Sequence, residues 1–129
     1  MKEDAVYRDL SGNTITQTIH ILTSHKERRQ QMDLKEYARF SVSEPIKTDI
    51  IKTAGSNIVI VCLEEGQVIP PHPEPYAVVF VVLEGEGIIT SGTVEHEVKP
   101  MHLVSVGKDE NRGIQCIKQM TLLGIREDV

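Results

Sequence analysis

Short apolar runs separated by glycine and proline turns dominate the chain from about Phe40 onward. The runs are rich in Val and Ile, which favour strands, and turn residues such as Gly66, Gly85 and Pro100 separate them. The predicted strands are Phe40–Val42, Ile46–Lys52, Asn57–Leu63, Val68–Ile69, Ala77–Leu83, Gly87–Ser91, Val94–Val98, Leu103–Val106, Gly113–Ile117 and Thr121–Ile125. No helix-length periodic segment interrupts them, which argues against alternating strands and helices. The pattern predicts an all-β sandwich or barrel.

Residues 1–39 have a different pattern. Ile15, Ile19 and Leu22 have helical spacing and are followed by the polar run HKERRQQ, so a helix within residues 14–32 is one interpretation. The run ITQTIHIL alternates almost as well as a strand does. We favour a helix for the polar half and leave the first half open. The sequence thus predicts a partly helical arm over residues 1–39, with a possible dimer contact, and one domain over residues 40–129.

Composition narrows the class of protein. The chain has 129 residues, which fits one domain, and only 4% aromatic residues with no Trp, so Val, Ile and Leu must build the core. The net charge of −5 argues against nucleic acid or an anionic membrane as a partner. Cys62 and Cys116 lie in apolar runs, which predicts buried thiols. The first ten residues lack the apolar stretch of a signal peptide, so we expect a cytoplasmic protein.

The stretch GQVIPPHPEPYAVVFVVLEGEG, residues 66–87, carries the most specific pattern in the chain. Gly66, His72 and Gly85 have the spacing of the first signature of the cupin superfamily, which the chain resembles. Further on, strand spacing places Gly107 at the usual proline of the second signature and Arg112 at its last metal-binding histidine. The resemblance covers residues 46–125, to small single-domain, RmlC-like cupins. It implies a jelly-roll barrel, also called a double-stranded β-helix.

The metal-binding side chains of the cupin pattern are mostly replaced. Glu74 stands at the second histidine and Val78 at the glutamate. His72 and Glu74 could ligate a divalent transition metal, but catalytic sites generally use about three protein ligands, and Arg112 would repel a cation. We therefore expect no resident cofactor. His96 and His102 are expected at the surface.

The resemblance implies that the predicted site residues face one pocket. His72, Glu74, Val78, Phe80 and Arg112 would face the barrel interior. Arg112 could pair with Glu74 or with a bound carboxylate or phosphate. Its run KDENR is equally consistent with an exposed charged turn.

Tyr76 follows Pro75 at the expected pocket mouth and could close over a ligand. With His72, Glu74, Val78, Phe80 and Arg112, it completes the set of predicted ligand-binding residues.

Three function classes follow from this pattern. The first is a barrel that binds a small, possibly anionic, molecule without robust catalysis. The alternative is an enzyme similar to metal-independent sugar epimerases or isomerases, with His72 and Glu74 as an acid–base pair and Arg112 holding an anionic substrate. A metal-dependent dioxygenase or isomerase is the weaker form of the enzyme hypothesis, because of the ligand count. The third class is a structural or regulatory partner that forms a homodimer.

Overall fold

The computed structural model describes residues 3–8, 14–19 and 31–127 and divides the chain into two compact units, Met1–Asp33 and Leu34–Val129. In the first unit, β1 (Glu3–Arg8) pairs antiparallel with β2 (Thr14–Ile19). The sequence left the first half of residues 14–32 open between helix and strand, and the structure has a strand there, over Thr14–Ile19. The polar run HKERRQQ, for which the sequence favours a helix, lies almost entirely outside the described residues.

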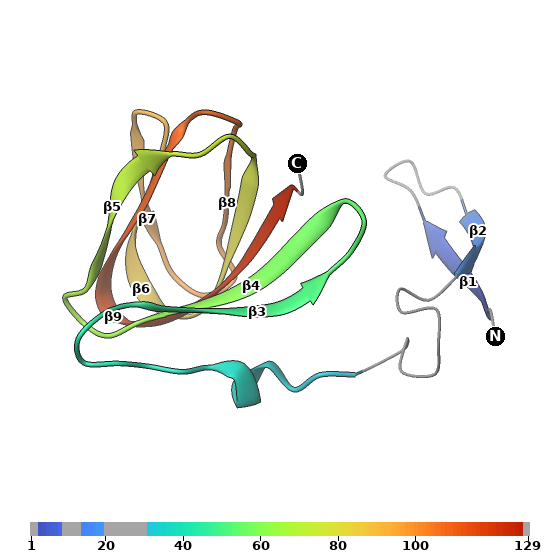
Figure 1. Ribbon diagram of the computed structural model, residues 1–129, viewed down its shortest axis with the longest axis horizontal. Coiled ribbons are helices and arrows are strands. Elements are labelled where there is room, and N and C mark those ends of the chain that lie inside the picture. Colours follow the sequence, from blue (N-terminus) through green and yellow to red (C-terminus); the bar gives the residue numbers. More distant parts are fainter. Residues whose placement is uncertain (1–2, 9–13, 20–30, 128–129) are drawn as a thin grey trace. The chain divides into compact units, whose positions relative to one another are not determined.

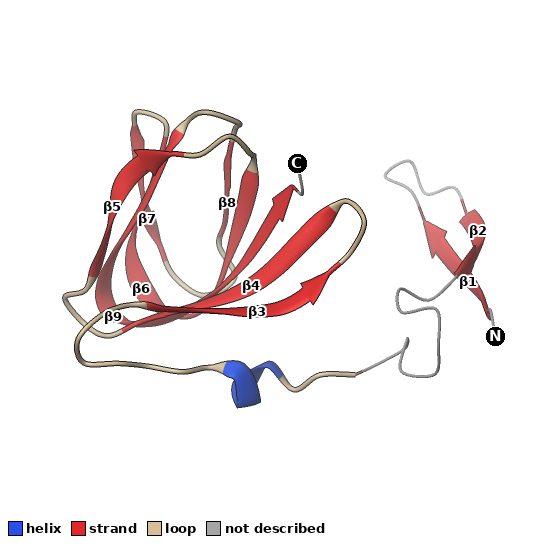
Figure 2. Ribbon diagram, in the orientation of Figure 1, coloured by secondary structure: helices blue, strands red, loops and turns tan. Residues whose placement is uncertain are grey.

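The second unit is a seven-stranded antiparallel barrel (Figures 1 and 2). Its strands are β3 (Ile46–Lys52), β4 (Ser56–Leu63), β5 (Val68–Pro73), β6 (Val78–Ser91), β7 (Val94–Val98), β8 (Leu103–Val106) and β9 (Asn111–Glu127). The sheet order is β3-β4-β9-β6-β7, with β5 paired to β9 and β8 paired to β6. The predicted all-β jelly roll is confirmed. The described residues contain one short 3-10 helix, η2 (Leu34–Tyr37), and no helix with the length and apolarity of a membrane span.

Two long strands replace four predicted short ones. Apart from Ala77, the predicted runs at 77–83 and 87–91 fall within β6, and those at 113–117 and 121–125 fall within β9. Gly85 has a φ of +86°, and the register between β6 and β9 shifts between Val82 and Gly87. A side chain at Gly85 would also collide with the backbone carbonyl of Gln119. The glycine therefore bends β6 without ending its pairing with β9.

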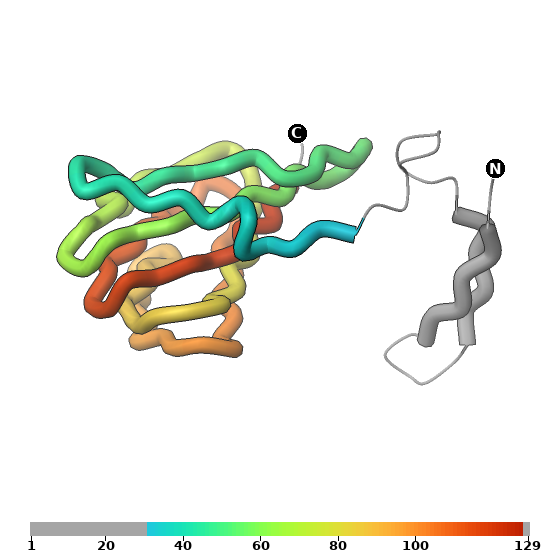
Figure 3. Tube along the Cα trace, turned by 90° about the horizontal axis from the view of Figure 1, so that it is seen from below, coloured from blue at the N-terminus to red at the C-terminus, as the bar shows by residue number. Residues whose placement is uncertain are grey.

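The predicted strand at Phe40–Val42 is wrong. The hydroxyls of Ser41 and Ser43 lie 2.9 Å apart, and the Ser43 amide donates to Ser41 Oγ at 3.2 Å. Such local side-chain bonds compete with strand pairing. The segment instead forms a strap, residues 34–45, that crosses the outside of the barrel (Figure 3). Gln67 Nε2 donates to Ser41 O at 2.7 Å and fastens it.

Alternate residues of β4, β6 and β9 point inward and form the core. The inward positions are Val59, Val61 and Leu63 of β4, Val78, Phe80, Val82 and Ile89 of β6, and Ile114, Cys116, Met120 and Leu122 of β9. Val98 of β7 and Val104 and Val106 of β8 complete the cluster. Both cysteines are free and buried, as predicted. Burial raises the pKa of each thiol above its ordinary value of 9.0.

Candidate functional site

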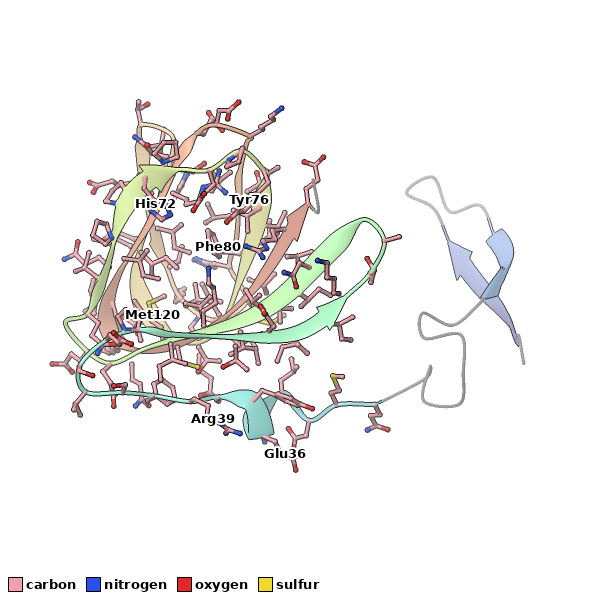
Figure 4. All side chains as sticks on the ribbon, in the orientation of Figure 1. Glu36, Arg39, His72, Tyr76, Phe80 and Met120 are labelled. Carbon is pink, nitrogen blue, oxygen red and sulfur yellow. The ribbon has the colours of Figure 1, made fainter. Side chains whose placement is uncertain are left out.

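A pocket opens at one end of the barrel and brings the six predicted site residues together. Its lining includes His72 of β5, Glu74 and Tyr76 of the following loop, Val78 and Phe80 of β6, and Arg112 of β9. Figure 4 shows His72 and Tyr76 at this end, Phe80 further inside, and Met120 at the opposite end. The cavity volume is about 80 Å³, well above the ~10–15 Å³ that one water needs. Whether these residues bind a ligand stays a prediction.

The interior wall of the pocket is apolar. It consists of Val59 and Val61 of β4, Val78 and Phe80 of β6, and Ile114 of β9. Strand alternation explains this wall, because inward positions on neighbouring paired strands face the same space. Gly124 of β9 also lines the pocket, between Val59 and Phe80. The wall can therefore hold an apolar group but offers it no hydrogen bond from a side chain.

Arg112 lies at the start of β9, opposite His72 of β5 and Ser91 of β6. It is only 4% exposed, so the interpretation that it sits in an exposed turn is wrong. Lys108, Asp109, Glu110 and Asn111 are exposed, but the chain enters β9 at Asn111, and Arg112, the next residue, is buried.

Backbone carbonyls bind most of the Arg112 guanidinium. Nη2 donates to Glu110 O at 3.0 Å and Gly107 O at 3.1 Å, with a longer contact of 3.5 Å to Glu74 O. Nε donates to Glu110 O at 3.3 Å. The guanidinium therefore clamps the turn between β8 and β9. The Asp109 amide donates to Glu74 O at 2.9 Å, so this turn also holds the loop after β5.

The charge of Arg112 has no carboxylate partner among the described residues. Of the two partners that the sequence allowed for Arg112, the Glu74 side chain is not one, because Arg112 contacts the Glu74 backbone carbonyl instead. The Nη1 atom of Arg112 is buried and has no hydrogen-bond partner within the described part of the chain. A buried charge without a counter-charge is costly, and so is an unsatisfied buried donor. This is the most unusual electrostatic feature of the pocket.

Tyr76 brings a second arginine into the site. The guanidinium carbons of Arg112 and Arg126 each lie 5.1 Å from the centre of the Tyr76 ring, within cation–π distance. Arg126 Nη1 also donates to Tyr76 Oη at 3.3 Å. The tyrosine ring thus lies in contact with both cations.

Sequence reasoning missed Arg126 and Lys47, which both line the pocket. Arg126 follows Leu122 and Gly124 on the inward face of β9, so strand alternation carried to the end of the strand would have found it. Lys47 of β3 lies opposite the inward Val61, but its own strand offers no comparable signal.

His72 and Glu74 form a contact at the mouth. His72 Nε2 lies 3.3 Å from Glu74 Oε2, and His72 Nδ1 lies 2.8 Å from Pro70 O. A carbonyl oxygen can only accept, so Nδ1 donates to Pro70 O, and Nε2 faces the Glu74 carboxylate. The side chains are 45% and 35% exposed. Both groups are therefore accessible from the pocket mouth.

The residues of the pocket do not fit the divalent metal that cupin resemblance implies. Val78 stands at the third ligand position, and two arginines line the same space. The described residues contain no cluster of three or more His, Cys, Asp or Glu side chains able to hold a metal. His96 and His102 are exposed, as predicted.

Comparison with known proteins bears on the fold. No family model and no curated protein matches the chain. An RmlC-like cupin from Desulfovibrio desulfuricans is 21% identical, with a TM-score of 0.69, over 76% of this chain and 95% of that one. The protein TT1209 from Thermus thermophilus is 21% identical, with a TM-score of 0.71, over 76% and 96% of the two chains.

A third similar structure is an uncharacterised protein with a double-stranded β-helix domain from Klebsiella pneumoniae. It is 20% identical, with a TM-score of 0.70, over 76% of this chain and 89% of that one. At these identities the likeness establishes architecture alone. The chain therefore has the double-stranded β-helix fold of the cupin superfamily.

Proposed function

We propose that the barrel binds a small anionic molecule in this pocket. The observation that carries the proposal is Arg112, a buried cation that lines the pocket without a carboxylate partner among the described residues. Lys47 and Arg126 add positive charge to the same lining, whereas Glu74 is already in contact with His72. The cations gather in a chain whose net charge is −5. This concentration of positive charge in a concave site favours an anion.

The cations would have different roles. Because Arg112 Nη1 is buried, Arg112 acts on a ligand mainly through its charge, which is weakly screened inside the barrel. Arg126 is half-buried, so its guanidinium can reach a ligand and present two parallel donors to two oxygens of an anion. A bound anion would offset part of the cost of burying Arg112.

A thermal-shift comparison of butanoate with butanamide tests the proposal, because the two probes differ mainly in charge. We expect butanoate to raise the melting temperature and butanamide to leave it unchanged. Arg126→Gln should weaken butanoate binding at least roughly tenfold, as loss of a charge-assisted hydrogen bond does. The control is Arg39→Gln, which removes the same charge from an exposed residue outside the pocket lining. Equal shifts for both probes, or full binding by Arg126→Gln, would contradict the proposal.

A second candidate function is proton-transfer catalysis on an anionic sugar, by an enzyme similar to metal-independent epimerases or isomerases. The His72–Glu74 contact favours it, because an imidazole and a carboxylate lie 3.3 Å apart at the pocket mouth. The apolar wall weakens it, because few groups remain to bind sugar hydroxyls. Deuterium incorporation into keto-sugar phosphates, followed in D2O, provides the test. Exchange that is lost in both His72→Gln and Glu74→Gln would support catalysis, and its absence would favour simple binding.

A further inference from the structure

We infer that the anion is a short carboxylic acid with an apolar tail. The inference rests on the proposed function and adds the part of the ligand that lies beyond its charged group. It has three supports: the composition of the interior wall, the charges around the mouth, and the position of Gly124.

The wall determines the chemistry of the tail. The polar side chains that line the pocket are Lys47, His72, Glu74, Tyr76, Arg112 and Arg126. The other lining residues are Val, Ile, Phe and Gly, which offer no side-chain hydrogen bond. Hydroxyl groups of a sugar or polyol placed against them would lose their water partners without replacement. An aliphatic tail loses nothing there and gains from leaving water.

The groups at the mouth favour a carboxylate over a phosphate. Arg126 is half-buried and offers one planar guanidinium, which matches the two oxygens of a carboxylate and leaves the third oxygen of a phosphate monoester without a partner on that guanidinium. The Glu74 carboxylate lines the same pocket. It repels each negative charge of a ligand and so offsets part of the attraction that Lys47, Arg112 and Arg126 exert on a second charge.

Gly124 determines how much tail the pocket accepts. A Cβ atom at this position would lie 3.1 Å from Val59 Cγ2 and 3.7 Å from Phe80 Cε1. Without a side chain here, Val59 and Phe80 pack directly over the backbone of β9, and both line the pocket. A methyl group added here would push against Val59 and narrow the pocket at the wall, whereas a smaller residue at position 80 would enlarge it.

Calorimetric titration with acetate, butanoate, hexanoate and octanoate tests the inference, with pentyl phosphate and hexanol as probes matched to hexanoate. We expect affinity to rise roughly fourfold for each buried CH₂ until the wall is filled. Hexanoate should bind more tightly than pentyl phosphate. Gly124→Ala should lower hexanoate affinity at least fourfold and lower acetate affinity less. Phe80→Leu should move the optimum to a longer acid, and it serves as the second variant if Gly124→Ala folds poorly.

The outcomes separate the two proposals. Affinity independent of chain length, a preference for pentyl phosphate, or an unchanged chain-length profile in Phe80→Leu would overturn the carboxylic acid inference and leave anion binding intact. Failure of every anion to bind, or equal binding of hexanol and hexanoate, would overturn the proposed function itself. A chain-length optimum that moves in opposite directions in the two variants would support the inference.

Discussion

The two ends of the barrel are built from the same strands and differ in packing and charge. At the end opposite the pocket, here called the closed end, the side chains of Leu63, Val82, Met120 and Leu122 are fully buried among apolar neighbours. At the pocket end, β6 and β9 enclose a cavity and a buried guanidinium that lacks a counter-charge among the described residues. The comparison indicates that the closed end supplies stability, whereas the pocket end gives up some stability and keeps a charged pocket, where we propose that an anion binds.

The largest expected effect is at the closed end. Leu122→Ala should lower the free energy of unfolding by about 2–5 kcal/mol, because it leaves a cavity in a fully packed core. Urea denaturation measures the change. The matched control is Leu103→Ala on β8, where the residue is 62% exposed and the expected change is within about 0.5 kcal/mol. Similar losses for the two variants would contradict the assignment of stability to this end.

A smaller effect concerns the buried thiols and alkaline pH. Burial raises the pKa of Cys62 and Cys116 above 9.0 in the folded chain. Below pH 9.0 the contribution of the protonated thiols to stability is fully present. It is lost as the pH rises through the pKa values of the folded chain, because the thiols of the unfolded chain ionise first. We expect stability to fall above about pH 9, by at most about 1.4 kcal/mol per pH unit for each thiol.

A Cys62→Ala/Cys116→Ala variant isolates this contribution, because other groups also titrate at alkaline pH. Its stability should depend less on pH in this range than that of the wild-type chain. Thiol labelling of the folded wild-type protein should also be slow near neutral pH, since both side chains are buried. Rapid labelling of both cysteines, or identical pH profiles for the two proteins, would argue against the burial described.

The smallest stability effect is expected at the pocket mouth. His72→Ala should change the free energy of unfolding by less than about 1 kcal/mol, since ion pairs at such exposure contribute little. Elemental analysis should find metal well below one equivalent per chain in both proteins. A stoichiometric metal that disappears in the variant would show that His72 and Glu74 ligate after all, and the pocket would need a different interpretation.

The sequence predicted the barrel because its turns have local causes. Gly66 and Gly92 adopt positive φ angles of 88° and 63°, which favour glycine, and β-branched runs lie between the turns. The sequence could not show whether Gly85 bends a strand or ends it, because the answer depends on whether β9 continues to pair with β6 beyond this residue. Two short predicted strands therefore became one at Gly85.

Family spacing brought the six predicted site residues to one pocket, but their partners were not predictable. Arg112 is bound by backbone carbonyls of the preceding turn, and such contacts depend on how the loop curls. Glu74 is in contact with His72 instead, two residues away along the chain. Only alternation along the last strand could have identified Arg126.

The central claim is that the pocket end of the barrel binds anions through its arginines. Calorimetric titration of the wild-type chain with butanoate and with butanamide, under the same low-salt conditions, tests it most directly. The account predicts saturable binding of the acid that weakens as salt is added, and no measurable heat from the amide. Binding of the amide with the affinity of the acid, or no binding of the acid, would contradict it.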